Sequence, residues 1–252
     1  MVGMMISLIV LSGLSAVYVN TSRSGRLTNT AIQLNQDLRA VMDIMVNDIR
    51  RAGFWAKANS GVNPFTTATT DLSLSNNGSC MLYSYDATYA GGTPGAVDSS
   101  ASFMDFFGFR FSGGSVQTLV PTANLTSTDT SANTGMPCAT DSVWENLTDQ
   151  RAITITTLVF NTIGSKCISY LSSTYNPTDP TTFNTWTTTG GNGPACSPTA
   201  PGAPTAYPAG ANTFVETRQI SITLAARSNT DSTLARSLTE TILVRNNRVI
   251  TP

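Results

Sequence analysis

The first nineteen residues carry no charged side chain, and the chain then continues without a proline as far as Pro64. A membrane-spanning helix needs about 20 apolar residues, whereas the apolar core of a cleaved secretory leader is shorter. We therefore expect residues 1–22 to form the membrane half of a long helix, residues 23–53 its amphipathic half, and residues 54–252 a head domain. The residues expected to form the membrane anchor are Gly3, Ile6, Leu8, Val10, Leu11, Leu14 and Val17.

The amphipathic half carries one apolar stripe. From Leu34 to Ala52 apolar residues recur at steps of three and four, with polar residues between them. Gly53 follows two arginines and suits the residue after a helix end, so the helix should stop near Ala52. The residues expected to join this helix to the sheet are Leu34, Leu38, Val41, Met45, Ile49 and Phe54.

Beyond Gly53 the pattern changes to a period of two, which is typical of strands with one buried face. The alternation predicts an antiparallel hairpin of residues 218–226 and 238–249, joined by a turn over 228–232. A striped helix beside such a sheet predicts an α+β fold. Further strands are expected over residues 80–86, 103–111, 153–160 and 166–171. The candidate core residues are Phe54, Trp55, Phe106, Phe109, Ile155, Ile222 and Leu224.

Composition limits the chemistry of this chain. Only 12% of the residues are charged, Lys and Arg number 14 against 15 Asp and Glu, and histidine is absent. No long-range positive field would attract nucleic acid, and catalytic sites of the Ser-His-Asp and Cys-His types are excluded. Asp141, Glu145 and Asp149 could share a helix face, but such carboxylates are more often solvated than catalytic. We expect no catalytic residue, no cofactor, no metal and no nucleic-acid partner.

Four cysteines lie far apart, without a Cys-x-x-Cys pair: Cys80, Cys138, Cys167 and Cys196. A mixed zinc site is impossible without histidine, and an even number of cysteines behind a membrane anchor predicts two disulfides in an oxidising compartment. Three connectivities are possible. We favour Cys80 with Cys138 and Cys167 with Cys196, because the second pair would close a Thr-, Gly- and Pro-rich loop.

Long polar loops are expected over residues 87–102, 121–138 and 172–210. The last, which holds Trp186 and Cys196, is either a contact surface or a solvated insertion. In an adhesin, aromatic residues such as Tyr89, Trp186 and Tyr207 could stack on sugars. Residues 129–133 offer oxygen ligands for calcium but lack the spacing of an EF-hand loop.

Several stretches together resemble the type IV pilins. They are the charge-free start Met1-Val-Gly-Met-Met-Ile-Ser-Leu-Ile-Val-Leu11, the long helix, its Asp48-Ile-Arg-Arg-Ala-Gly-Phe54 ending and the disulfide-bearing β-rich head. Five motifs are similar, more narrowly, to the PilW family of minor pilins: the same Asp48-Ile-Arg-Arg-Ala-Gly-Phe54 ending, Tyr83-Ser-Tyr-Asp86, Phe107-Gly-Phe-Arg110, Trp144-Glu-Asn-Leu-Thr-Asp149 and Val244-Arg-Asn-Asn-Arg248. The resemblance implies a pilin-like fold, with the long helix packed on an antiparallel head.

The same resemblance implies a function. Such a subunit would sit in the bacterial inner membrane with its head in the periplasm, join other minor pilins in a complex that primes pilus assembly, and stay near the pilus tip. Its partners would be pilin subunits, the assembly machinery and, in one version, a tip adhesin. The chain lacks the nucleotide-binding loop Gly-x₄-Gly-Lys-[Ser/Thr], so another component would supply the work of assembly.

Members of this family begin with a basic leader, a cleavage-site glycine and a Phe-Thr-Leu-Ile-Glu-Leu type segment, whereas this sequence starts at Met1. We expect that an upstream segment with these features, including the methylated first residue, belongs to the full protein. The nearest alternative is a J-type minor pseudopilin of type II secretion, which is similar in anchor and head. An adhesin subunit of the pilus tip is another.

Overall fold

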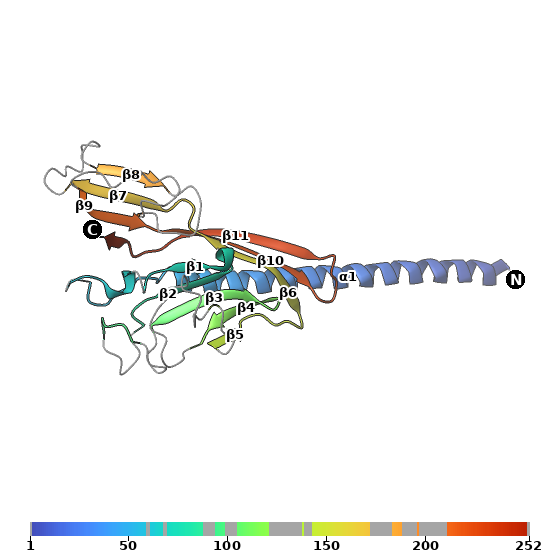
Figure 1. The fold of residues 1–252 in the computed structure, drawn as a ribbon. Helices are drawn as coiled ribbons and strands as arrows, with labels where there is room; N and C mark the ends of the chain where they lie inside the picture. Colours follow the sequence, from blue (N-terminus) through green and yellow to red (C-terminus); the bar gives the residue numbers. More distant parts are fainter. Residues whose placement is uncertain are drawn as a thin grey trace.

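The computed structural model describes residues 2–58, 61–67, 70–87, 94–98, 105–120, 138, 143–171, 183–187, 196 and 211–250. One helix, α1 (Val2–Ile49), is followed by three antiparallel sheets. Figure 1 shows that α1 extends far beyond the sheets at its N-terminal end. The predicted α+β class, with a long N-terminal helix and an antiparallel head, is confirmed.

The first sheet has the strand order β1-β2-β3-β4-β5, the second β11-β10-β6 and the third β12-β9-β7-β8. The first is built from β1 (Ser73–Ser75), β2 (Cys80–Ser84), β3 (Phe106–Ser112), β4 (Ser115–Leu119) and β5 (Trp144–Asn146). The second contains β6 (Ile153–Asn161), β10 (Gln219–Ser228) and β11 (Ala235–Leu243). The third contains β7 (Lys166–Leu171), β8 (Phe183–Thr187), β9 (Ala211–Thr217) and β12 (Arg248–Ile250). Two short 3₁₀ turns, η1 (Pro64–Thr66) and η2 (Asn76–Gly78), flank β1.

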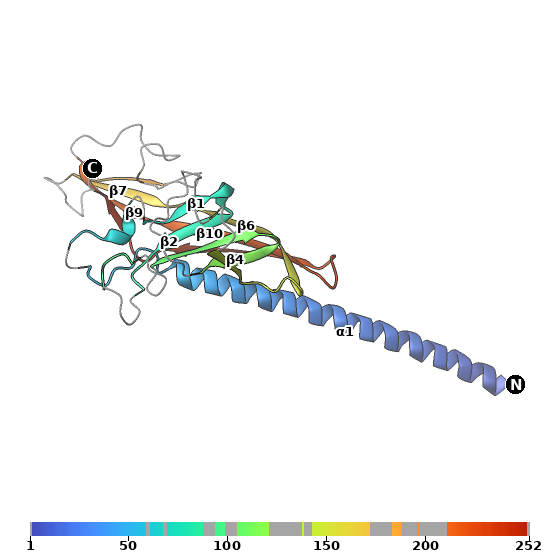
Figure 2. The ribbon, with the colours of Figure 1, turned by 60° about the horizontal axis from the view of Figure 1, so that its bottom comes forward.

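The head covers only the C-terminal half of α1, as both ribbon views show (Figures 1 and 2). The buried side of this half packs on β10 and β11. Its buried residues are Leu34, Leu38, Val41, Met42, Met45, Val46 and Ile49. They join one core with Tyr83 and Phe109 of the first sheet and Ile155, Ile222 and Leu224 of the second. Phe106 lies in a separate small core beside Cys80 and Trp144.

Helix α1 ends three residues before the predicted position. Arg51 and Ala52 form tighter turns, each donating its N–H to the carbonyl three residues earlier, and Gly53 follows with a left-handed φ of 72°. This reversal carries the chain away from the helix axis. The prediction that Phe54 joins the helix to the sheet is therefore wrong, because its side chain is 44% exposed.

The prediction of one strand over residues 238–249 is also wrong. β11 ends at Leu243 and β12 begins at Arg248 in another sheet, with residues 244–247 between them. β9 and β10 pass between the same two sheets, with Arg218 alone at the crossing. The chain thus crosses between the second and third sheets three times: from β6 to β7, from β9 to β10, and from β11 to β12.

Strands β1, β4, β5, β8 and β9 escaped the sequence analysis, and residues 145–149 form the end of β5 and a turn in place of a helix face. The structure contains disulfides Cys80–Cys138 and Cys167–Cys196, which is the pairing that the loop argument favours. The first links β2 to the 121–138 segment, and the second links β7 to the 172–210 segment. Apart from Cys138, residues 183–187 and Cys196, these two segments lie outside the described residues.

Candidate functional site

The candidate site is the uncovered half of α1. Its apolar side chains point away from the helix into open space, with Leu8 65% and Tyr18 74% exposed. The helix is long and apolar enough to cross a membrane, and its most apolar stretch has no part buried in the head. All seven residues expected to form the anchor, from Gly3 to Val17, lie on this uncovered half. A surface of this size and polarity indicates contact with lipid or with other apolar helices.

Three serine hydroxyl groups on this half are satisfied within the helix itself. Ser7 donates to the carbonyl oxygen of Gly3 at 3.0 Å, Ser12 to that of Ile9 at 2.8 Å and Ser15 to that of Leu11 at 2.8 Å. A polar group without a partner is costly in a hydrocarbon environment. These serines therefore do not oppose burial of the helix in lipid or against another helix.

Charge marks the end of the apolar half. The first charged side chain after the start is Arg23, and Arg26 follows one turn later, both of them exposed. At 1.5 Å per residue, the uncharged stretch of residues 2–22 spans about 31 Å, close to the thickness of a bilayer's hydrocarbon core. In a helix that crosses a membrane over this stretch, the boundary would lie near Arg23, well before Leu34, the first buried residue of α1.

Asp48 fixes the end of α1 to the first sheet. Its carboxylate accepts hydrogen bonds from the phenol groups of Tyr83 at 2.5 Å and Tyr85 at 2.7 Å. Burial, together with the Asp48 carboxylate, raises the pKa of Tyr83 well above its ordinary value. Arg51 lies 3.7 Å from Asp48 and covers the Tyr85 ring at 4.1 Å. The helix therefore meets the head through a directional contact as well as an apolar stripe.

A buried ionic cluster, which the sequence analysis missed, holds the third sheet in place. Arg218 pairs with Asp71, and Arg248 lies 3.3 Å from Asp71 and 3.6 Å from Glu216. Arg218 also donates to the carbonyl oxygen of Asn246 at 2.7 Å. Because Asp71 and Arg218 are 147 positions apart, no local pattern could have linked them.

Among the residues considered for other functions, those that the structure describes do not form a second site. Glu145 and Asp149 are exposed on β5 and the following turn, and Asp149 accepts the backbone N–H of Arg151. Trp186 belongs to β8, and only its backbone is described. Asp141, Tyr89, Tyr207 and residues 129–133 lie outside the described residues. Within the described part of the chain, no three His, Cys, Asp or Glu side chains gather into a metal site.

Comparison with known proteins identifies a family. A family model described as prepilin peptidase-dependent protein B matches residues 28–244, which is most of the chain and includes the packed half of α1 and nearly all of the head. No curated protein and no solved structure matches the chain.

Proposed function

This chain belongs to the prepilin peptidase-dependent protein B family, and on that premise we propose that it is a minor pilin that helps to prime type IV pilus assembly. Membership makes it a type IV pilin-related protein. The finer parts of the proposal are a place among PilW-like minor pilins, a complex with other minor pilins and a position near the pilus tip. The head motifs quoted above support them.

The observation that carries the proposal is the division of α1 into two halves. One half packs an apolar stripe against the head, and the other projects as an apolar rod in which Ser7, Ser12 and Ser15 satisfy their hydroxyl groups internally. At about 0.8 kcal/mol per buried CH₂, transfer of such a rod from lipid into water would be prohibitive. It can leave the membrane only by packing against similar helices, which is how a filament core would form.

The proposed locations follow from this division. Before assembly, residues 1–22 lie in the inner membrane and the head lies in the periplasm, where the oxidising compartment suits both disulfides. After assembly, the same residues lie in the filament core and the head on its surface. We propose a structural role without catalysis, with other pilins and the assembly machinery as partners.

A deletion strain tests this function. Loss of the gene should reduce the number of surface pili and, where twitching depends on them, slow the spreading of colonies, and the intact chain should restore both. Normal piliation with a defect in protein secretion would overturn the proposal in favour of the J-type pseudopilin. Normal piliation and normal secretion would overturn both.

A further inference from the structure

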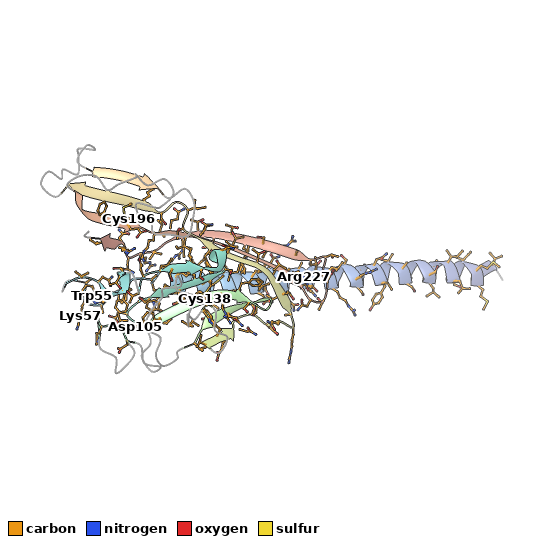
Figure 3. All side chains as sticks on the ribbon, viewed as in Figure 1. Trp55, Lys57, Asp105, Cys138, Cys196 and Arg227 are labelled. Atoms are coloured by element: carbon orange, nitrogen blue, oxygen red, sulfur yellow. A yellow bond between two sulfur atoms is a disulfide. The ribbon has the colours of Figure 1, made fainter. Side chains whose placement is uncertain are left out.

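A groove lies at the end of the head where α1 terminates, which we call the distal groove. Its described lining residues belong to two parts of the chain, 53–58 with 61–66, and 245–249, and its volume is about 470 Å³. Figure 3 shows Trp55, one of its lining residues, at the end of the molecule opposite the N-terminus of α1. A groove of this size fits a few residues of a peptide.

Carbonyl groups of residues 50–53, at the end of the helix beside the distal groove, already have donors. These pairs are Arg245 N–H with Arg50, Phe54 N–H with Arg51, the Asn246 side-chain amide with Ala52 at 3.2 Å, and the Asn63 side-chain amide with Gly53 at 2.8 Å. Asn63 also accepts the N–H of Phe65 through its side-chain oxygen. The helix end therefore presents few free acceptors to a ligand in the groove.

The groups that remain available are donors and apolar surface. Arg245 and Asn247 line the groove with exposed side chains that make no hydrogen bond or ion pair within the described part of the chain. Val62 is 85% exposed and Val249 57% exposed, and both line the same groove. None of the lining residues that the structure describes is acidic. A matching ligand must supply acceptors or negative charge next to an aliphatic group.

The walls of the groove are held in place from behind. The Trp55 indole N–H donates to the carbonyl oxygen of Gly95 at 3.0 Å, and the N–H of Gly95 donates to Asp86 at 2.7 Å. At the second lining segment, the Arg218 guanidinium donates a hydrogen bond to the carbonyl oxygen of Asn246. A groove fixed in this way loses little conformational entropy when it binds.

We propose that the distal groove binds an extended acidic segment of a partner protein, with a carboxylate on Arg245 and an aliphatic side chain against Val62 and Val249. Strand β12, which holds Val249, is an edge strand of its sheet, so its outer side can receive an extended backbone. Only the choice of partner rests on the proposed function. The partner is another subunit of the pilus assembly, which lies beyond the end of this head.

In-cell photo-cross-linking of the full chain tests the proposal. A benzophenone side chain replaces Val62, and a second variant carries it at Leu243, which is exposed on β11 outside the groove. We expect a cross-linked protein from position 62 alone, and mass spectrometry should place the link in a segment containing Asp or Glu. Absence of a product, the same product from both positions, or a segment without an acidic residue would overturn the proposal.

Charge-reversal variants provide a second test of the proposal. Arg245→Glu should reduce the position-62 product at least tenfold, whereas Arg236→Glu, at an exposed arginine on β11, should leave it unchanged. Changing the cross-linked partner's acidic residue to Arg should restore the product with Arg245→Glu. Equal yields from both arginine variants, or no restoration, would overturn the proposal. If pili depend on this chain but position 62 gives no product, the groove proposal fails and the proposed function stands.

Discussion

Asp48 is the residue that joins the end of α1 to the first sheet by hydrogen bonds. Two phenol groups converge on its carboxylate, and Tyr83 is completely buried. Removal of the carboxylate would leave a buried donor without its acceptor, which costs about 1 to 3 kcal/mol. We expect Asp48→Ala to lower the free energy of unfolding by about 3 kcal/mol because two donors are affected. Urea unfolding of the purified chain in detergent would measure the change.

Asp43→Ala is the matched control, because Asp43 is exposed on the same helix one turn and a half earlier. Its unfolding free energy should differ from that of the wild type by less than about 0.5 kcal/mol. Equal effects of the two alanine substitutions would show that the contact of Asp48 with the tyrosines is not stabilising.

Tyr83 should make the stability of the head sensitive to alkali. Its pKa in the folded state lies well above the value near 10 of an unfolded tyrosine, so folding keeps the proton on this phenol. The stabilisation is complete below pH 10 and is lost as the pH rises from 10 towards the folded pKa, because the unfolded state releases its proton first. Urea unfolding between pH 9 and 11 should show this decline. Tyr83→Phe should lessen its slope, and an unchanged slope would contradict the assignment.

At the scale of elements, Gly53 follows the end of α1 in a left-handed conformation that other residues adopt at a cost. Its φ is 72°, and a Cβ atom there would lie 2.8 Å from the Arg218 guanidinium. Gly53→Ala should destabilise the head by about 1 to 2 kcal/mol through the left-handed backbone, with a further loss if Arg218 moves. Gly13→Ala is the control, since a Cβ at Gly13 meets no atom within 4 Å. The temperature of thermal unfolding should therefore be lowered by Gly53→Ala and left unchanged by Gly13→Ala.

The sequence predicted elements well where a periodic pattern meets a single buried face. The stripe from Leu34 to Ile49 and the alternation over β10 are of this kind, and both lie in the core. The division of residues 238–249 between two sheets had no such signal, because both strands alternate in the same way and the break at Arg245 is set by contact with the end of α1. Long-range contacts of this sort have no local pattern.

Of the two functional features, the apolar half of α1 was predicted from the sequence and the distal groove was not. Absence of charge identified the apolar half of α1 directly, and the distal groove escaped prediction because its lining residues come from segments about 190 positions apart. Phe54 shows the same limit in one residue: its hydrophobicity indicated the core, and the reversal at Gly53 exposed it.

At the scale of the whole molecule, the uncovered half of α1 should hold the protein in the membrane. An arginine near the centre of a membrane helix costs about 3 kcal/mol on insertion scales. Leu11→Arg should therefore move much of the protein out of the membrane fraction after carbonate extraction. Gln33→Arg, on the exposed side of the packed half, should leave the distribution unchanged. Equal retention of both variants would argue against an anchor over residues 1–22.

The claim that this half of α1 moves from the membrane into a filament is tested most directly by a photo-cross-linker at Leu8. Filaments sheared from the cell surface should contain the chain linked through position 8 to another pilin subunit, and the membrane fraction should hold the unlinked form. A cross-linker at Leu38, which is buried in its own head, should give no such product. A chain confined to the membrane fraction, or one that reaches the filaments without a subunit linked at position 8, would contradict the account.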